Sequence, residues 1–319
     1  MSHAPVSQLR PDGRLRHLLT LDGLSAAMLT SLLDAADALR EQALGGTALR
    51  AQLAGKTVCT LFFEPSTRTR SSFQLAATRL GADTLGFDVR ASSTRKGETA
   101  LDTMKNLEAM GVDCFVVRHA DNGTVAALAA GARPGTAFVN AGDGQSAHPT
   151  QGLLDMLTLR QRKGADFSRL KVLIVGDVRH SRVARSDLHA LQTLGAGEIR
   201  VCAPASLLPD ADVLQGCRVL PNLDDALADV DAVMMLRLQR ERMDEGMVPS
   251  LEQYFADYGL TAARLRRARP DAIVLHPGPM NRGVEIADAV ADGPQSVILD
   301  QVSNGVAVRM AVLEAVLAS

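Results

Sequence analysis

The chain has 319 residues, of which 46% are hydrophobic and 22% are charged, and its formal net charge is −2. These values are typical of a globular protein with enough residues for two domains of ordinary size. The near-neutral charge and the absence of Trp disfavour a nucleic-acid partner, and no apolar run approaches the length of a bilayer span. We therefore expect no nucleic-acid partner and no membrane association.

The N-terminal segment and the cysteines indicate where the protein acts. Met1 to His17 mixes prolines, a glycine and several charges without an apolar core, so we expect a loose arm rather than a signal peptide. The four cysteines form no Cys-x-x-Cys pair, and three of them lie in apolar runs, namely Cys59, Cys114 and Cys202. We expect free thiols and, with them, a cytoplasmic location.

The first half of the chain alternates between patterns typical of helices and of strands. Helical periodicity covers Ser25 to Gln42 and Thr99 to Met110. Strand-like runs lie at Thr57 to Phe63, Thr84 to Phe87 and Asp113 to Arg118. Apolar residues recur at helical spacing from Ser71 to Leu80, so we expect the chain to turn from strand to helix at Ser66.

The second half repeats this alternation after a segment rich in turn-forming residues. That segment, Asn140 to Pro149, precedes a helix expected from Thr150 to Arg162. Further strand-like runs are Leu170 to Val175, Ile199 to Ala203, Ala232 to Leu236, Ala272 to Leu275 and Val297 to Asp300. A last apolar helix is expected from Gly305 to Ala318.

Alternating strands and helices predict an α/β fold with two domains, each a parallel β-sheet flanked by helices. We place the first domain at residues 1–149 and the second at residues 150–304. The C-terminal helix, at residues 305–319, is expected to return to the first domain.

One strand-like run ends in a cluster of hydroxyl and guanidinium side chains, Ser66-Thr67-Arg68-Thr69-Arg70. The start of the helix that follows offers unpaired backbone N–H groups and positive potential. The hydroxyl groups and the bidentate guanidinium of Arg68 can complete a site for a phosphate. A plain N-cap with an exposed arginine explains the same residues, and this segment alone leaves both interpretations open.

Polar residues also follow the other strand-like runs. Because ligands of open parallel sheets bind beyond the carboxyl ends of the strands, we expect these residues to converge within each domain. In the first half they are Arg118 with His119, and His148 with Gln151. In the second half they are Asp177 to Arg182, Arg237 with Gln239, and His276-Pro277-Gly278-Pro279.

Each of these residues has more than one interpretation. Arg182 and Arg237 can each hold a carboxylate, or can form a structural ion pair. His148 suits a neutral hydrogen-bond donor, although a catalytic base or a capping residue also fits. His276, which precedes a proline, is expected to set the shape of a turn. The loop at Gly176 lacks the Gly-x-Gly-x-x-Gly spacing of dinucleotide sites, so we expect no nicotinamide cofactor.

Two further observations bear on the chemistry. His, Asp and Cys residues show no metal-ligand spacing, and no nucleophile motif is present, so neither a metal nor a covalent nucleophile is required. The polar segment Ser92 to Thr99 leads into a helix, and its Lys96 could serve a phosphate of its own subunit or of a neighbour. An ordinary exposed loop is the alternative for that segment.

Together these residues resemble the aspartate/ornithine carbamoyltransferase superfamily over nearly the whole chain. The resemblance rests on segments that occur in the order of the family: Phe63 to Arg70, Lys96 to Thr99, Val117 to His119, Asn140 to Gly144, His148 to Gln151, Leu236 to Gln239, and His276 to Pro279. Two segments depart from the pattern, the N-terminal arm and the loop Arg179-His180-Ser181.

The resemblance implies that carbamoyl phosphate and L-aspartate react to N-carbamoyl-L-aspartate and phosphate in pyrimidine biosynthesis, without a cofactor. It implies a phosphate site made of Ser66, Thr67, Arg68 and Thr69, and polarisation of the carbamoyl oxygen by Thr69, Arg118 and His148, with Gln151 near the amino group. It assigns aspartate to Arg182, Arg237 and Gln239, and places Gly278 and Pro279 at the substrate. It also implies a homotrimer in which Ser92 and Lys96 reach the site of the adjacent subunit.

Two other functions remain open on the sequence. Ornithine-specific members of the family carry a cysteine after the histidine of the His276 motif, whereas this chain has Pro277. Arg237 also suits a dicarboxylate better than a cationic side chain. A catalytically silent relative that serves as an assembly or regulatory partner is the other alternative. A larger assembly with a dihydroorotase-like or regulatory chain is open as well.

Overall fold

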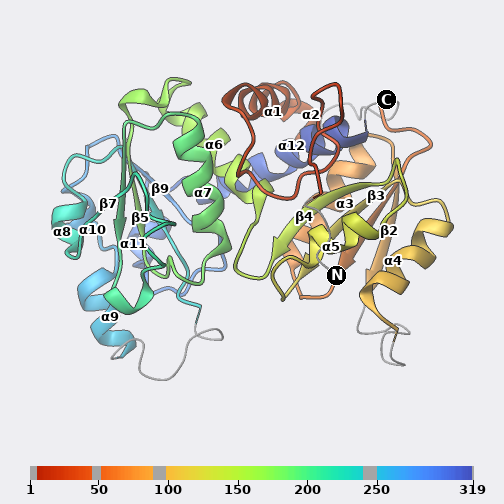
Figure 1. Cartoon of the computed structure of the whole chain (residues 1–319). Coiled ribbons are helices and arrows are strands. Elements are labelled where there is room, and N and C mark those ends of the chain that lie inside the picture. The colour runs from red at the N-terminus through yellow and green to blue at the C-terminus, as the bar shows by residue number, and fades with distance from the viewer. Residues whose placement is uncertain (1–5, 45–51, 89–97, 240–249, 318–319) are drawn as a thin grey trace. The chain divides into compact units, whose positions relative to one another are not determined.

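The computed structural model describes residues 6–44, 52–88, 98–239 and 250–317 (Figure 1). The chain divides into two compact units. Unit 1 comprises Met1–Leu153 and Val302–Ser319, and unit 2 comprises Leu154–Gln301. The chain passes between the units within two helices, α6 (Pro149–Lys163) and α12 (Ile298–Leu317).

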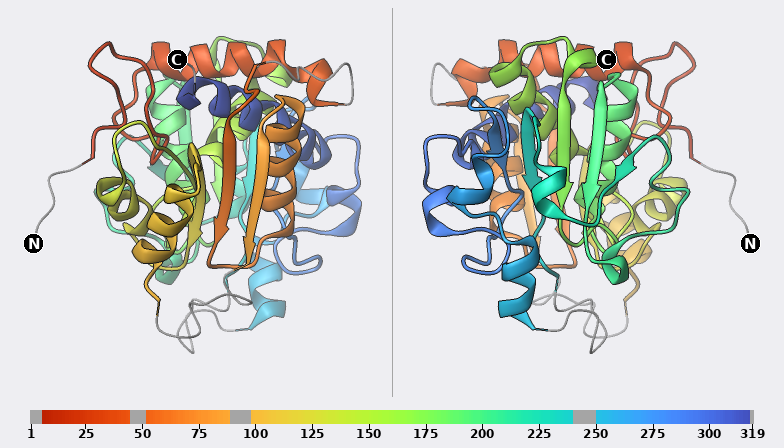
Figure 2. Two further views of the ribbon diagram at one scale, coloured as in Figure 1. Left: turned by 90° about the vertical axis from the view of Figure 1, so that its right-hand side faces the viewer. Right: turned by 90° about the vertical axis from the view of Figure 1, so that its left-hand side faces the viewer.

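Unit 1 contains a parallel four-stranded sheet in the order β2-β1-β3-β4. Its strands are β1 (Thr57–Phe62), β2 (Asp83–Asp88), β3 (Cys114–His119) and β4 (Ala137–Asp143). Its helices are α1 (Ala26–Ala38), α2 (Arg40–Ala43), α3 (Thr67–Arg79), α4 (Ala100–Ala109) and α5 (Thr124–Gly131). The unit 1 part of α12 packs on α3, where the guanidinium of Arg309 lies 5.1 Å from the ring centroid of Phe73. In Figure 1 and in both views of Figure 2, this part of α12 also lies beside α1.

Unit 2 contains a parallel five-stranded sheet in the order β7-β6-β5-β8-β9. Its strands are β5 (Lys171–Val175), β6 (Glu198–Cys202), β7 (Arg218–Val219), β8 (Ala232–Met235) and β9 (Ile273–Leu275). Its helices are α7 (Arg182–Thr193), α8 (Leu223–Ala226), α9 (Leu251–Tyr258), α10 (Ala262–Leu265) and α11 (Asp288–Ala291). One core cluster joins Val175, Val233 and Val274 of the sheet to Leu223, Leu265 and Val290 of the helices. The predicted fold class, two helix-flanked parallel sheets with a returning C-terminal helix, is confirmed.

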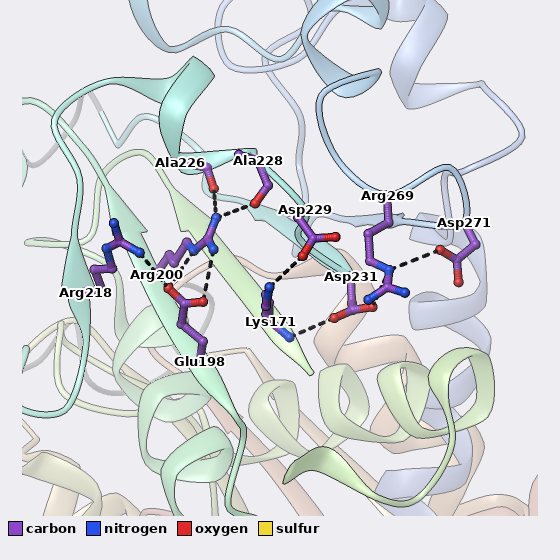
Figure 3. Close-up of polar contacts among 10 residues, drawn as sticks. All are labelled: Lys171, Glu198, Arg200, Arg218, Ala226, Ala228, Asp229, Asp231, Arg269 and Asp271. Carbon is purple, nitrogen blue, oxygen red and sulfur yellow. Dashed lines mark hydrogen bonds and ion pairs between the residues drawn. The ribbon is translucent and has the colours of Figure 1, made fainter. Parts of the chain in front are cut away.

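A polar network binds the starts of the strands of unit 2 to the segments that precede them (Figure 3). The buried guanidinium of Arg200 pairs with Glu198 at 2.9 Å and donates to the carbonyl oxygens of Ala226 and Ala228, at 2.9 and 2.6 Å. The ammonium of Lys171 lies 2.6 Å from Asp229. These contacts stabilise the amino-terminal edge of the sheet. The polar loops that follow the strands lie at the opposite, carboxyl edge.

The N-terminal segment is not the loose arm that we expected, at least from residue 6 onward. Leu15, His17 and Leu18 are buried. The N–H of Leu18 donates to the carbonyl oxygen of Phe138 at 2.8 Å, next to β4, and Arg10 donates to the carbonyl oxygen of Val316 in α12 at 3.0 Å. Leu15 and Leu18 therefore belong to the core of unit 1, while Met1 to Pro5 lie outside the described residues.

Two predicted elements are wrong. Val297 to Asp300, expected as a strand, contains the start of α12, and only Ser296 bridges to Val274 of β9. A short apolar run fits a strand or a buried helix equally well, and here the helix continues through it. Asn140 to Asp143, expected within a loop, forms the end of β4, because its turn-forming residues are buried and paired with β3.

The cysteines of the described residues are free thiols, as expected, and Cys59, Cys114 and Cys202 are buried. Burial raises the pKa of the Cys59 and Cys202 thiols to about 12, so they are protonated at neutral pH. Over the described ranges, no helix is both long and apolar enough to cross a bilayer.

Candidate active site

The N-terminus of α3 follows β1 after a short loop and differs in one respect from the other α-helices that begin after a Ser or Thr cap. Ser66 is its N-cap, in extended conformation, but the hydroxyl makes no capping hydrogen bond. The hydroxyls of Ser25, Thr99 and Ser250 accept such a bond at their own helices, from Met28, Asp102 and Gln253. Thr67 and Arg68 are exposed, whereas Thr69 is buried. The first turn of α3 thus presents a hydroxyl that does not cap the helix, beside an exposed guanidinium.

Arg118 lies at the end of β3, next to β1. Phe62 pairs with Arg118 across the two strands. The Arg118 guanidinium donates to the carbonyl oxygen of Ala141 at 3.2 Å and lies 3.4 Å from the carboxylate of Glu64. These contacts to β4 and to the segment that follows β1 hold the guanidinium at the carboxyl edge of the sheet.

His148 and Gln151 stand where β4 leads into α6. Both are buried, and the N–H of Gln151 donates to the carbonyl oxygen of His148 at 2.9 Å. The preceding loop is closed by Asp143, whose carboxylate accepts hydrogen bonds from Gly123 N–H at 3.0 Å and from the Ser146 hydroxyl at 3.3 Å. In unit 1 the start of α3, Arg118 and His148 therefore all follow or end strands at the carboxyl edge of one parallel sheet.

In unit 2, a buried carboxylate organises the residues that follow β5 and β8. Asp177 lies 2.8 Å from Nδ1 of His180 and accepts a hydrogen bond from the N–H of Gln239 at 3.3 Å. The Gln239 side chain donates to the carbonyl oxygen of His180 at 3.1 Å. Burial raises the pKa of Asp177, and the contacts from His180 oppose that change. Asp177 thus fixes Gln239 against the loop that leads to Arg182, the buried first residue of α7.

The sequence places Asp177 among the polar residues that follow the strands, but predicts no role for its own carboxylate. The available signal was an acidic residue directly after a buried strand, at the edge where parallel sheets bind ligands. Only the fold places its two carboxylate oxygens against one residue three positions away and another sixty-two positions away.

The loop after β9 is shaped by His276, as expected. Nδ1 of His276 accepts a hydrogen bond from the N–H of Gly278 at 2.8 Å, and Nε2 lies 3.2 Å from the carboxylate of Glu285. Gly278 has a φ of +61°, a conformation that favours glycine, and precedes Pro279 through a cis peptide bond. Asn281 donates to the carbonyl oxygen of Leu238 at 3.4 Å, which brings this loop beside the one that carries Arg237 and Gln239.

Ser92 and Lys96, assigned by the resemblance to the site of an adjacent subunit, lie outside the described residues. Within the part of the chain that the structure describes, no three His, Cys, Asp or Glu side chains gather in an arrangement that could hold a metal ion.

Comparisons with known proteins add independent evidence. The family model for the carbamoyl-phosphate-binding domain of aspartate/ornithine carbamoyltransferases matches residues 16–161, and the model for the Asp/Orn-binding domain matches residues 168–316. A protein of Xanthomonas campestris, the aspartate carbamoyltransferase catalytic subunit, is 72% identical over 97% of this chain and 98% of its own length.

Solved structures of carbamoyltransferases are also similar to this chain. Aspartate transcarbamoylase of Trypanosoma cruzi in complex with N-(phosphonacetyl)-L-aspartic acid is 32% identical, has a TM-score of 0.87, and covers 98% of both chains. Ornithine carbamoyltransferase of Pyrococcus furiosus is 30% identical with a TM-score of 0.85, and covers 95% of this chain and 97% of its own. With both family models matched across two parallel-sheet units, the chain belongs to the aspartate/ornithine carbamoyltransferase family.

Proposed function

We propose that this chain is the catalytic chain of an aspartate carbamoyltransferase. It transfers the carbamoyl group of carbamoyl phosphate to the amino group of L-aspartate, giving N-carbamoyl-L-aspartate and phosphate for pyrimidine (UMP) biosynthesis. The observation that carries this proposal is the 72% identity, over nearly the full length, to an aspartate carbamoyltransferase catalytic subunit. The bound ligand of the Trypanosoma cruzi structure, N-(phosphonacetyl)-L-aspartic acid, joins a phosphonate to an aspartate and supports the same pair of substrates.

Carbamoyl phosphate binds to unit 1 in this proposal, and residues 1–149 with 305–319 form its domain. Ser66, Thr67, Arg68 and Thr69 hold the phosphate, since the start of α3 combines hydroxyls, a guanidinium and backbone N–H groups. Thr69, Arg118 and His148 contact the carbamoyl oxygen, and Gln151 the amino group.

Aspartate binds to residues 150–304, the second domain. Arg182 and Arg237 pair with its carboxylates, and Gln239, fixed by Asp177, orients it. Gly278 and Pro279 line the site, on a loop whose shape His276 maintains.

The reaction is the attack of an amine on a carbamoyl carbon, and it depends on positioned reactants and on stabilised oxyanion charge. Arg118 and a neutral, donating His148 stabilise negative charge as it develops on the carbamoyl oxygen. The departing phosphate accepts the proton that the amine loses. Arg68, Thr69, Arg118 and His148 are therefore the catalytic residues of the proposal, and the chemistry requires no cofactor.

The chain acts as a homotrimer in the cytoplasm, with Ser92 and Lys96 completing the site of the neighbouring subunit. The trimer can join a larger assembly with a dihydroorotase-like or regulatory chain. This part of the proposal rests on the family resemblance of the Lys96 to Thr99 segment and, for the location, on the free cysteines.

Ornithine carbamoyltransferase is the second candidate, because an ornithine enzyme matches the fold about as well as the aspartate enzyme does. Turnover of carbamoyl phosphate with L-aspartate and with L-ornithine separates the two. We expect carbamoylation of aspartate only, and its loss in Arg68→Ala but not in Arg79→Ala, a control at the other end of α3. Turnover of ornithine instead of aspartate would show that the chain is an ornithine carbamoyltransferase. If neither amino acid is carbamoylated, the chain is better explained as a catalytically silent relative.

A further inference from the structure

A bulge interrupts the pairing of β3 with β4 at the position of Arg118. Two pairs of residues frame it: Val117 with Asn140, and His119 with Asp143. Between these pairs, β4 has two residues, Ala141 and Gly142, opposite the single residue Arg118 of β3. Bulges are common beside active sites, where they change the direction of a side chain or end the pairing of strands. This bulge therefore lies where it can affect Arg118.

The bulge brings a backbone carbonyl group to the Arg118 guanidinium. Nη1 of Arg118 donates to the carbonyl oxygen of Ala141 at 3.2 Å. Gly142, the second residue of the bulge, has a φ of +125°, a conformation that favours glycine. Because Ala141 belongs to the bulge, the position of its carbonyl oxygen depends on the path that the chain takes there.

The side chain of Asn140 holds the bulge from the residue before it. Its Oδ1 accepts a hydrogen bond from the N–H of Gly142 at 2.8 Å, and its Nδ2 donates to the carbonyl oxygen of Leu19 at 2.8 Å. One partner is a donor and the other an acceptor, so they determine the orientation of the amide. Asn140 is 1% exposed, which strengthens both bonds because bulk water does not compete for them. The bulge is thereby anchored to the segment that precedes α1.

The residue after the bulge is fixed as well. The N–H of Asp143 donates to the carbonyl oxygen of Ala147 at 3.0 Å, and its carboxylate accepts a hydrogen bond from the N–H of Gly123 at 3.0 Å. The N–H of Gly144 donates to the carbonyl oxygen of His119 on β3, also at 3.0 Å. With this end held, the bond from Gly142 to Asn140 selects the path of the chain through the bulge.

We propose that Asn140 is a positioning residue, which holds the bulge of β4 so that the Ala141 carbonyl oxygen orients the Arg118 guanidinium. Asn140 acts through Arg118. The effect on turnover rests on the proposed function, in which Arg118 stabilises charge on the carbamoyl oxygen, whereas the contact between Asn140 and the bulge does not depend on it.

Hydrogen exchange of the full chain tests that contact without any measurement of activity. The N–H of Gly142 should exchange slowly in the wild type, because it is buried and bonded to Asn140, and faster in Asn140→Ala. Thr136→Val is the matched control, since it removes a buried hydrogen bond to Glu108 just before β4 and should leave exchange at Gly142 unchanged. Equal exchange at Gly142 in the wild type and in Asn140→Ala would overturn the proposal.

Kinetics test the effect on the proposed reaction. Because displacement of Arg118 weakens its contact with the transition state, Asn140→Ala should lower kcat by about tenfold to a hundredfold. The KM for aspartate, which binds to unit 2, should stay unchanged, and Thr136→Val should leave kcat unchanged. Asn140→Asp keeps an oxygen for the N–H of Gly142 and should retain most of the wild-type kcat. If Asn140→Asp loses as much kcat as Asn140→Ala, the bond to Leu19 is the important one, and the proposal is wrong.

A double-mutant cycle shows whether Asn140 acts through Arg118. In an Arg118→Ala background, Asn140→Ala should cause little further loss of kcat, because the guanidinium that it positions is already absent. Losses that add in full would overturn the positioning role. Should Asn140→Ala fail to fold, Asn140→Leu removes the same bond to Gly142 without leaving a cavity. A wild-type chain that is inactive with both amino acids would refute the proposed function and leave the exchange result standing.

Discussion

At the scale of single residues, His17 shows how burial decides the charge of a side chain. It has 0% exposed surface, its Nδ1 accepts a hydrogen bond from the N–H of Phe138 at 3.1 Å, and its ring packs against that of Phe138. Burial, together with the nearby Arg16 and Arg10, lowers the pKa of His17 to about 4. The imidazole is therefore neutral in the folded chain over the whole range in which an exposed histidine gains a proton.

This predicts a loss of stability in acid. The unfolded chain binds a proton at His17 below about pH 6.5 and the folded chain only near pH 4, so the free energy of unfolding falls across that window. The contribution is about 2 kcal/mol between pH 7 and pH 5. His17→Asn, which keeps an acceptor for Phe138 but does not titrate, should lose this part of the pH dependence in urea unfolding at the two pH values. Equal slopes for the two proteins would show that His17 is protonated in the folded state.

At the scale of elements, the helices that begin after a Ser or Thr differ in whether the hydroxyl of that residue accepts a hydrogen bond from a backbone N–H of the helix. Ser25 caps α1 through a bond from Met28 N–H at 3.1 Å, which satisfies one of the unpaired donors at that end. Ser66 at the start of α3 makes no such bond. The hydroxyl at α1 thus contributes to stability, while the one at α3 is available to a ligand.

Alanine substitution at the two caps should separate stability from activity. Ser25→Ala is expected to cost about 1 kcal/mol of stability and to leave turnover unchanged. Ser66→Ala is expected to cost less than about 0.5 kcal/mol, and to weaken carbamoyl phosphate binding by the loss of one hydrogen bond, about tenfold. Thermal unfolding and the KM for carbamoyl phosphate measure both effects. A larger loss of stability in Ser66→Ala than in Ser25→Ala would contradict the proposal that the Ser25 hydroxyl stabilises its helix whereas the Ser66 hydroxyl binds a ligand.

At the scale of the whole molecule, the proposed trimer makes each active site depend on two chains. Lys96→Ala should damage the site of a neighbour, and Arg237→Ala the site of its own chain. Either variant alone should then be nearly inactive. In a closed ring of three, every hybrid trimer contains one site in which an intact Lys96 meets an intact Arg237.

Dissociating and reassociating an equal mixture of the two variants should therefore restore roughly one quarter of the wild-type activity. The measurement is the carbamoylation rate before and after mixing, with each variant treated alone as the control. If the mixture stays as inactive as its components, the sites are not shared between subunits.

The order of the elements and the segments that follow the strands could be predicted from the sequence alone. Helical and strand periodicity are local, so the strand before Ser66, the helix after it and the helix after Pro149 could be predicted from neighbouring residues. The residues after each strand could be assigned to one edge because parallel strands all end there. The roles proposed for them come from the family resemblance.

Features that depend on contacts between residues far apart in the chain could not be predicted from the sequence. Asn140 to Asp143 form part of a strand because they are buried and pair with β3. The apolar run that begins at Val297 is helical because α12 starts within it. The buried Asp177 shows the physical reason most clearly. Only the pairing of β5 with β8 brings Gln239, sixty-two positions away, to the same carboxylate that contacts His180.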